Sequence, residues 1–412
     1  MILSWLLTRT GRQAGNFCRH VQKALSAQRD MLSHPANDAV AAAISDLRKQ
    51  VRSDADNETL RQGMAKLEKI AAKWLKPHPH ASIRENIEVV LVAISVALAI
   101  RTFFLQPFKI PTGSMQPTLY GITCEDLRDD PTVRIPAAWW RRVLGVVWTG
   151  VSFRHVVAED DGKLEAIEPV QRIFPFVTRQ RLKVGEKWHS VWLPVENLSP
   201  KRPHMNPQEV FLLDYAGVEP EHLYHKGDDI VKVRIKNGDH LFVDRLSYNF
   251  RRPKRGEIVV FETKGIMSPL TGQPAMPQDQ FYVKRLIALG GESVSIGNDR
   301  HVRIKGQRLD ASTPHFENVY TFNPAQAPKD GHYSGHLNGH IASQFTENQI
   351  APLFRDANAI FTVRAGHCLV LGDNTLNSSD GRTWGDFSWT NVIGKYCCVY
   401  WPISSRFGWA AD

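Results

Sequence analysis

Two residues of the chain have the chemistry of a nucleophile and its base. Ser114 lies in residues 107–119, PFKIPTGSMQPTL, where prolines and a glycine favour an exposed turn. A serine hydroxyl reacts poorly unless a base lies within hydrogen-bond reach. Lys284 lies in the apolar residues 282–287, YVKRLI, and burial there disfavours the ammonium and lowers the lysine pKa. An uncharged Lys284 is therefore a candidate general base for Ser114.

A third polar stretch, residues 371–385 with the sequence LGDNTLNSSDGRTWG, follows a strand-like segment. Ser378 is a candidate for orienting a lysine amine, and Asp380 and Arg382 are candidates for an ion pair that braces the loop. Taken singly, these features also fit an ordinary turn serine, a lysine whose ammonium reaches solvent, and a polar surface loop. The motif G-x-S-x-G is absent, so nothing indicates an α/β-hydrolase triad.

Strands must position these residues, and the chain has a mainly β pattern from about residue 107 onward. Apolar runs bounded by turn residues predict strands at residues 230–235, 241–243, 257–261, 280–287, 294–296, 302–304, 368–371 and 395–401. Turns are expected at Asn237-Gly238 and Gly290-Gly291. No helix-length periodic run separates these strands, which favours an antiparallel β catalytic domain over βαβ units.

The first 82 residues have helical periodicity and are expected to form a cytoplasmic region. Apolar residues three and four apart give two helix faces, made by Val40, Ile44, Leu47 and Val51 and by Leu60, Met64, Leu67, Ala71 and Trp74. They predict a helical hairpin that either packs on itself or self-associates. Residues 1–7 are apolar but too short to span a bilayer.

An uncharged stretch, VVLVAISVALAI at residues 89–100, predicts a single transmembrane helix over residues 83–106. As helix, residues 89–105 cover about 26 Å, slightly less than the hydrocarbon core of about 30 Å. The positive-inside rule places the N-terminus in the cytoplasm and the later residues outside, because cations precede the stretch at Lys66, Lys69, Lys73, Lys76 and Arg84. A buried helix of a soluble protein is the alternative.

Composition excludes several classes of protein. The 412 residues are 42% hydrophobic and 23% charged, which does not fit a wholly disordered chain, a collagen or a polytopic membrane protein. The formal charge of +9 suits an anionic membrane surface as well as nucleic acid. Much of this charge flanks the apolar stretch, so no nucleic-acid partner is expected. Five cysteines are too few for a disulfide scaffold.

Five ordered segments together resemble bacterial type I signal peptidases, membrane-bound serine proteases that cut signal peptides from exported preproteins. The segments are the apolar stretch, PTGSMQPTL, GDHLFVDRL at residues 238–246, RGEIVVF with YVKRLI, and GDNTLNSSDGRTWG. The resemblance implies that Ser114 is the nucleophile, Lys284 the general base and Ser378 the residue that orients the lysine. It also implies an oxyanion hole of Thr112 and the Ser114 amide, a bracing pair of Asp380 and Arg382, and no metal or cofactor.

The same resemblance implies shallow pockets for small side chains, the basis of cleavage after Ala-x-Ala, lined by Phe108, Ile110, Met115, Leu119 and Val283. The expected partners are signal peptides and the lipid bilayer. The expected location is the bacterial inner membrane, crossed once, with the catalytic domain on the periplasmic face. The chain would then divide into helices (1–82), a transmembrane helix (83–106), a catalytic domain (107–119, 238–310 and 362–412) and two insertions (120–237 and 311–361).

The chain departs from the family pattern in three places. Thr375-Leu376 stands where the family usually has a charged pair. The insertion 120–237 is rich in tryptophan, and a β-rich module that buries these side chains is favoured over a membrane patch with Arg141 and Arg142. The tryptophans in question are Trp139, Trp140, Trp148, Trp188 and Trp192. In the insertion 311–361, glycines between His332, His336 and His340 argue for a loop, so no metal site is expected there.

Two other classes of function remain as alternatives. A self-cleaving transcriptional repressor shares the Ser/Lys chemistry, but it would need a helix-turn-helix domain in place of the apolar stretch. A catalytically silent membrane scaffold fits the two insertions and the helical hairpin. A silent scaffold does not explain why Ser114, Lys284 and Ser378 occur together.

Overall fold

The computed structural model describes residues 9–53, 55–75, 81–130, 132–174, 177–193, 211–347 and 349–410. The predictions for residues 1–7 and for Lys76 lie outside these ranges. The chain divides into two compact units, Met1–Val96 and Ala97–Asp412. Each unit is described by itself.

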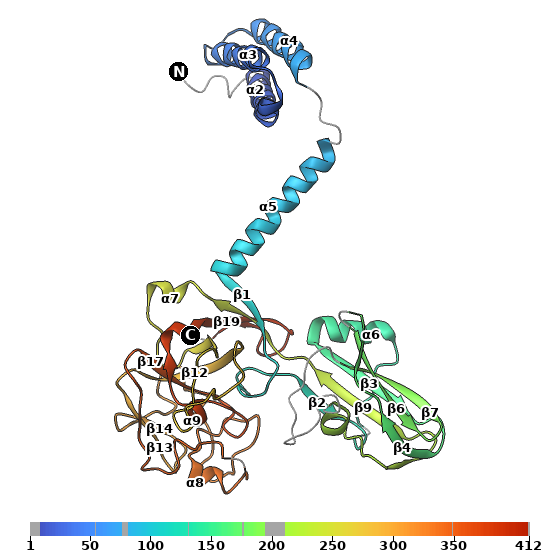
Figure 1. Cartoon of the computed structure of the whole chain (residues 1–412), viewed down its shortest axis with the longest axis vertical. Coiled ribbons are helices and arrows are strands. Elements are labelled where there is room, and N and C mark those ends of the chain that lie inside the picture. Colours follow the sequence, from blue (N-terminus) through green and yellow to red (C-terminus); the bar gives the residue numbers. More distant parts are fainter. Residues whose placement is uncertain are drawn as a thin grey trace. The chain divides into compact units, whose positions relative to one another are not determined.

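The described part of the first unit contains three packed helices, α2 (Arg9–Gln28), α3 (His34–Arg52) and α4 (Asn57–Trp74), with a short turn η1 (Arg29–Met31) after α2 (Figure 1). Both predicted helix faces are present, and α4 begins where the Asp56 carboxylate accepts hydrogen bonds from the Glu58 and Thr59 amides. The hairpin prediction missed α2. This helix completes the core with Ala14, Cys18, Val21 and Leu25.

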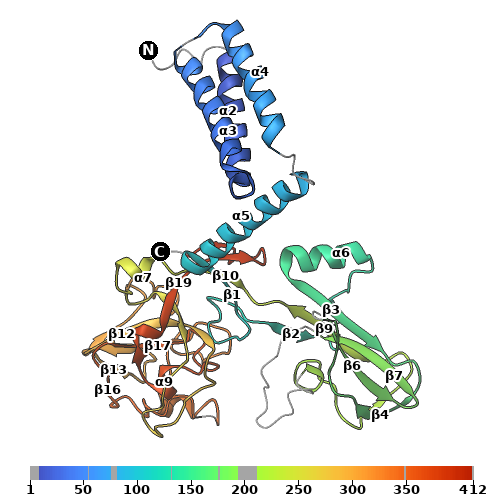
Figure 2. The ribbon, with the colours of Figure 1, turned by 45° about the horizontal axis from the view of Figure 1, so that its top comes forward.

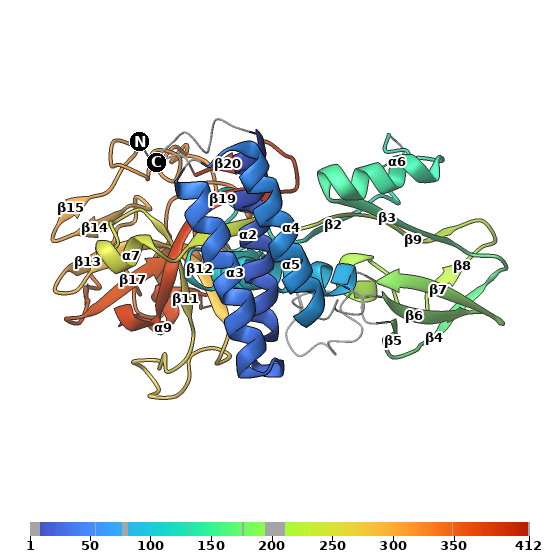
Figure 3. The ribbon, with the colours of Figure 1, turned by 90° about the horizontal axis from the view of Figure 1, so that it is seen from above.

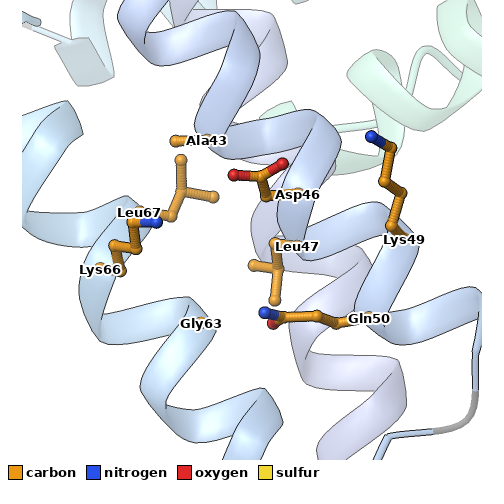
Figure 4. Close-up of a pocket in the computed structure, with 8 residues that line it drawn as sticks. All are labelled: Ala43, Asp46, Leu47, Lys49, Gln50, Gly63, Lys66 and Leu67. Atoms are coloured by element: carbon orange, nitrogen blue, oxygen red, sulfur yellow. The ribbon is translucent and has the colours of Figure 1, made fainter.

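Helices α3 and α4 approach each other closely at Gly63. A Cβ at this position would lie 2.2 Å from Oε1 of Gln50 and 2.9 Å from a methyl carbon of Leu47, so a larger residue would force these two side chains to move. Beside this contact is a cavity of about 170 Å3 with Lys49 and Lys66 at its rim (Figure 4). The apolar faces of α2, α3 and α4 pack against one another, and self-association stays a prediction.

Helix α5 (Ala81–Phe103) is the one described helix whose length and composition suffice to cross a membrane, over Asn86–Phe103. Its side chains from Ile87 to Phe104 are exposed. The helix ends before the predicted boundary at residue 106. The apolar run continues into strand β1, because Leu105 and Gln106 pair with Asp244 and Val243 of a neighbouring strand.

The largest sheet of the described residues lies in the second unit and has eight antiparallel strands (Figure 2). Its order is β1 (Leu105–Lys109), β10 (His240–Asp244), β19 (Val392–Trp401), β11 (Ile258–Glu262), β12 (Phe281–Leu289), β17 (His367–Leu371) and β18 (Phe387–Ser388), with β20 (Gly408–Trp409) beside β19. Adjacent residues of a strand point to opposite faces. Accordingly, Val259 and Val260 of β11 enter two different apolar clusters.

A smaller, separate antiparallel sheet begins just after β12 in the chain. Its order is β15 (Gln307–Arg308), β14 (Val302–Ile304), β13 (Ser293–Ile296) and β16 (Phe361–Thr362). Residues 311–361 are mostly loop, and they cover this sheet with Phe316, Val319, Tyr320 and Phe354. Short helices complete the domain, α7 (Ser247–Phe250), α8 (Gly339–Ala342), α9 (Gly381–Trp384) and η4 (Trp389–Asn391).

Residues 120–237 form a β-rich module with its own core. One sheet has the order β2 (Thr123–Asp126), β9 (Asp229–Lys236) and β3 (Val151–Val157). The other has β5 (Gln171–Phe174), β6 (Val177–Val184), β4 (Gly162–Ile167) and β8 (Leu223–Tyr224), with β7 (Lys187–Leu193) beside β6. Between β2 and β3 the chain forms the helical turns α6 (Trp139–Leu144) and η2 (Gly145–Thr149), and between β7 and β8 it forms η3 (Phe211–Tyr215).

The two ends of this module lie side by side. The Asp239 amide donates to the Tyr120 carbonyl at 2.8 Å, and the Tyr120 amide donates to Oδ2 of Asp239 at 2.7 Å. Strands β9 and β10 were both predicted, but the turn at Asn237-Gly238 does not make them a hairpin. β9 pairs with β2 and β3, whereas β10 pairs with β1 and β19.

The prediction that the module buries its tryptophans is wrong. Trp139 is 74% exposed, Trp140 49%, Trp148 54%, Trp188 41% and Trp192 48%. The core is built instead from Tyr224 and aliphatic side chains of the strands, together with residues 211–218. Trp188 and Trp192 lie on β7, and the helical segment α6–η2, which carries the other three tryptophans, lies outside the sheets (Figure 3).

Candidate active site

The structure brings Ser114 and Lys284 together, although they are 170 residues apart in the sequence. Ser114 lies in the turn that follows β1, and Lys284 lies in β12. Lys284 Nζ donates a hydrogen bond to Ser114 Oγ at 2.7 Å and a second one to the Val283 carbonyl at 3.3 Å. This is the distance that a base needs to accept the serine proton.

Lys284 is buried, with 3% of its surface exposed. Burial lowers the pKa of Lys284 to about 8, and the charges of Asp380 and Asp373 oppose part of this shift. The Nζ atom also lies 5.5 Å from the ring centre of Tyr282. At mildly alkaline pH a substantial fraction of this lysine is therefore the free amine, the form that accepts a proton.

The turn that carries Ser114 is held by Asn374. The Asn374 amide donates to the Ser114 carbonyl at 3.1 Å, and Nδ2 donates to the Gly113 carbonyl at 2.9 Å. Nδ2 also donates to Oδ1 of Asp330 at 2.7 Å, and the Gly331 amide donates to Oδ1 of Asn374 at 3.3 Å. The second insertion thus contributes Asp330 and Gly331 to the support of the nucleophile, which the sequence did not indicate.

On the opposite face of β12, Arg285 makes a buried bidentate ion pair with Asp373. Nε and Nη2 of Arg285 lie 2.8 and 2.7 Å from the two carboxylate oxygens. Asp373 also accepts a short hydrogen bond from the Thr118 hydroxyl, so the pair ties β12 to the end of the nucleophile turn. A cavity of about 600 Å3 lies on this face, beside Arg285 and away from Lys284.

The predicted pair of Asp380 and Arg382 is present and fully buried. Nε and Nη2 of Arg382 each lie 2.9 Å from an Asp380 oxygen, and Oδ2 accepts the Gly372 amide at 3.0 Å. Burial opposes ionisation of Asp380, but the charge and hydrogen bonds of Arg382 outweigh it and hold the pKa of Asp380 below its usual range. Arg382 also donates to Oγ1 of Thr375 at 2.9 Å. Thr375, at the position of the family departure, is therefore part of the same brace.

A family model described as "Signal peptidase, peptidase S26" matches residues 83–123 and 230–401. These ranges contain Ser114, Lys284 and the Asp380–Arg382 pair, and they make up more than half of the chain. The chain belongs to the signal peptidase family S26. The match omits residues 124–229, which fall within the first insertion.

Several known members of the family are similar to this chain. Signal peptidase I of Helicobacter pylori (strain J99 / ATCC 700824) is 30% identical over 194 residues, which are 42% of this chain and 61% of that protein. Signal peptidase I of Leptolyngbya laminosa is 28% identical over 170 residues, 41% of this chain and 64% of that protein. The chain therefore spans about three fifths of the length of these two relatives.

Among solved structures, a signal peptidase I from Enterococcus faecalis V583 matches 35% of this chain and 97% of its own, with 25% identity and a TM-score of 0.21. The mainly antiparallel sheets and the membrane-length helix α5 accord with the family assignment made from the sequence match.

Ser378, the expected family residue for orienting the lysine, lies beside the nucleophile turn but makes no such bond here. Within the described residues, its buried Oγ has no hydrogen-bond partner. It packs against Gly372, where a Cβ would lie 2.1 Å from Ser378 Oγ and 2.6 Å from the Ser114 carbonyl oxygen. Gly372 is thus required for the close approach of these two serines, and the role of Ser378 stays a prediction.

The remaining family positions lie around Ser114. Thr112 is exposed two residues before it, and its role in an oxyanion hole stays a prediction. The expected pocket residues belong to one apolar cluster: Ile110, Met115 and Leu119 are buried in it, and Phe108 and Val283 are partly buried against it. The Phe108 ring meets the Phe281 ring edge-on, with centres 5.3 Å apart. Phe281 was not among the predicted residues.

The described residues contain no group of three or more His, Cys, Asp or Glu side chains placed to hold a metal ion. Of the three spaced histidines, His336 is buried and its Nδ1 lies 3.1 Å from the Tyr320 hydroxyl, whereas His332 and His340 are exposed. These three side chains do not converge on one point of the loop.

Proposed function

We propose that this chain is a membrane-bound serine endopeptidase that removes signal peptides from exported preproteins, cutting after small residues of the Ala-x-Ala type. The observation that carries the proposal is the 2.7 Å hydrogen bond between Lys284 Nζ and Ser114 Oγ in a site that desolvates the lysine. Membership of the signal peptidase family supports the choice of substrate.

In the proposed reaction, neutral Lys284 accepts the hydroxyl proton while Ser114 Oγ attacks the carbonyl carbon of the scissile peptide bond. The resulting ammonium gives its proton to the leaving amine as the peptide C–N bond breaks, which leaves an acyl-enzyme on Ser114. Lys284, again neutral, then takes a proton from a water molecule that attacks the ester, and it returns this proton to Ser114 Oγ as the ester C–O bond breaks. The products are the signal peptide carboxylate and the mature amino terminus.

The negative charge of the tetrahedral intermediate needs hydrogen-bond donors next to Ser114. The Ser114 amide and the Thr112 hydroxyl are the proposed donors, and one such donor is typically worth about 3 kcal/mol in the transition state. Asn374 supports this arrangement, because it donates hydrogen bonds to the Gly113 and Ser114 carbonyls. The bond to the Gly113 carbonyl fixes the orientation of the peptide group that carries the Ser114 amide.

The substrate is proposed to bind as an extended strand. In the described part of the sheet, β1 pairs only with β10, and residues 281–284 of β12 have no strand on the side opposite β11. The Phe108–Phe281 contact brings these two free edges close together. Backbone hydrogen bonds to either edge do not depend on the substrate's side chains. Selection of small substrate side chains is therefore assigned to the apolar cluster around Met115.

The proposed location is the bacterial inner membrane, crossed once by α5. The cations that precede α5 in the sequence support an orientation with the N-terminal helices in the cytoplasm and the catalytic domain on the periplasmic face. A signal peptide's apolar segment lies in the same bilayer, so anchoring the protease there raises the local concentration of substrate.

The alternative, a catalytically silent scaffold on this fold, is less well supported. A scaffold gains nothing from a lysine held uncharged against a serine, and burying that amine costs stability. The self-cleaving repressor is also disfavoured, because the three-helix unit is followed by an exposed apolar helix rather than by a soluble linker.

Preprotein cleavage by the full-length chain in vesicles tests the proposal. Ser114→Ala and Lys284→Arg should abolish turnover, because arginine keeps its proton in proteins. Matched controls are Ser379→Ala and Lys254→Arg, which change exposed side chains and should leave the rate unchanged. Normal processing by either dyad variant would reject the mechanism. In sealed vesicles, digestion of residues 120–237 only from the cytoplasmic side would overturn the proposed orientation.

A further inference from the structure

The first insertion carries an exposed apolar helical segment that its own core does not use. Residues 139–149, WWRRVLGVVWT, form α6 and η2 as one continuous helical stretch. Every side chain in it is exposed, including Trp139 at 74%, Val147 at 55% and Trp148 at 54%. An apolar surface of this kind on a soluble module marks an interaction site.

The charges of this segment indicate what covers it. Residues 131–150 contain no acidic side chain and three arginines, Arg134, Arg141 and Arg142. The Arg141 guanidinium lies 5.1 Å from the Trp140 ring centre, and Arg142 Nε donates to the Pro136 carbonyl at 2.6 Å. Tryptophan and arginine side by side on an apolar helix are typical of segments that lie in the headgroup region of an anionic bilayer.

The segment is fixed to the catalytic sheet. Trp401 Nε1 donates to the Val147 carbonyl at 2.7 Å, and the Ile403 amide donates to the Trp148 carbonyl at 2.8 Å. A third bond joins the Asn237 amide to the Gly150 carbonyl at 2.9 Å. The helical stretch therefore cannot swing freely on its module, because its C-terminal turn is tied to the end of β19.

This attachment lies close to the end of the candidate membrane helix. Trp401 is the register partner of His240, and His240 is the partner of Lys109, the last residue of β1. β1 begins two residues after α5 ends and runs for five residues, about 13 Å, to Lys109, and Trp401 lies two strands further, about 10 Å across the sheet. A surface this near to a membrane crossing is within reach of the same bilayer.

We propose that residues 139–148 form an interfacial helix that inserts its tryptophans among the headgroups of the anionic bilayer crossed by α5. This second contact fixes the tilt of the catalytic domain, and Arg141 and Arg142 attract the phosphates. A second copy of the chain or another protein would fit the exposed apolar surface alone. It would not explain why residues 131–150 carry three arginines and no acidic side chain.

Photo-crosslinking of the full-length chain in vesicles of phosphatidylethanolamine and phosphatidylglycerol tests this inference. Benzophenone-alanine at Val143 should capture phospholipid in severalfold higher yield than the same probe at Glu165, an exposed position of the same module. The probe at Val92, in α5, reports separately on the proposed membrane crossing. Lipid capture by the probe at Val143 therefore tests the interfacial helix, whereas lipid capture by the probe at Val92 tests the membrane crossing by α5.

A second measurement tests the charges. The double change Arg141→Gln and Arg142→Gln should reduce lipid capture at Val143 severalfold in the anionic vesicles and leave capture at Val92 unchanged. Lipid capture at Val143 no higher than at Glu165 would overturn the inference. So would capture of a second chain in place of lipid, because it would identify the surface as a protein interface.

Discussion

The side-chain Nδ2 of Asn374 donates a 2.9 Å hydrogen bond to the carbonyl of Gly113, the residue directly before the candidate nucleophile. Asn374→Asp removes this donor and places a carboxylate opposite Asp330. We expect kcat for preprotein cleavage to fall by about 100-fold with little change in KM, since small displacements of a nucleophile have effects of this size. Asn377→Asp is the matched control, because Asn377 is exposed and should tolerate the same change. Equal rates for both variants would show that the turn holds without Asn374.

The rate of cleavage should depend on pH through Lys284. Because burial lowers its pKa to about 8, kcat/KM should rise about tenfold per unit at lower pH and level off about one unit above that value. A midpoint near the usual lysine pKa of about 10.4 would contradict a desolvated base.

The same pKa shift predicts how stability changes with pH. The pKa of Lys284 is about 8 when folded, below its usual value, so the unfolded chain binds more protons between the two values. Wild type should therefore gain stability relative to Lys284→Met as pH rises through this interval. Denaturant titrations in detergent at several pH values measure the difference, and a difference that falls as pH rises would contradict the shift.

Ser378 should matter for catalysis more than for stability. Its buried Oγ has no partner among the described residues, so Ser378→Ala removes no hydrogen bond seen here and should leave the unfolding midpoint nearly unchanged. If the hydroxyl orients the Lys284 amine, as the family resemblance implies, the variant should lose about 10- to 100-fold in kcat. Ser379→Ala, at an exposed neighbour, is the control. Full activity of Ser378→Ala would remove the residue from the mechanism.

The Asp380–Arg382 pair should be a main contributor to local stability. Arg382→Ala leaves the fully buried Asp380 carboxylate without its cation, which typically costs about 3–5 kcal/mol in the free energy of unfolding. Glu165→Ala breaks the partly exposed pair with Lys183 and should cost about 1 kcal/mol or less. Denaturant titration of both variants in detergent measures the contrast. Similar losses in the free energy of unfolding would mean that the buried Asp380–Arg382 pair contributes no more to stability than a partly exposed pair.

Many of the β-strands were predictable because each has a recognisable local sequence pattern. The apolar runs around Val233, Val260, Lys284 and Val370 are bounded by turn residues, and each became a strand close to its expected limits. The pairing of these strands was not predictable. Nothing local distinguishes a hairpin at Asn237-Gly238 from the observed crossing between two sheets, since the partners of β9 and β10 lie far away in the sequence.

The pairing of Ser114 with Lys284 was expected from the resemblance that the ordered segments carry together, because a turn serine and a lysine in an apolar strand also fit ordinary roles when each is taken singly. Asp330 gave no such signal, because it is an acidic residue in a polar loop and its value comes only from meeting Asn374. The exposure of Trp139 and its neighbours was predicted wrongly for a similar reason. A general preference for burying tryptophan cannot reveal that aliphatic residues already fill the core.

The meeting of Tyr120 and Asp239 has a consequence for the history of this protein. A module whose entry and exit touch can be gained, lost or resized during evolution without shifting the strands that flank it. Chains of very different length can thus share one hydrolytic framework, and a designer could exchange residues 121–238 for a short linker as one cassette.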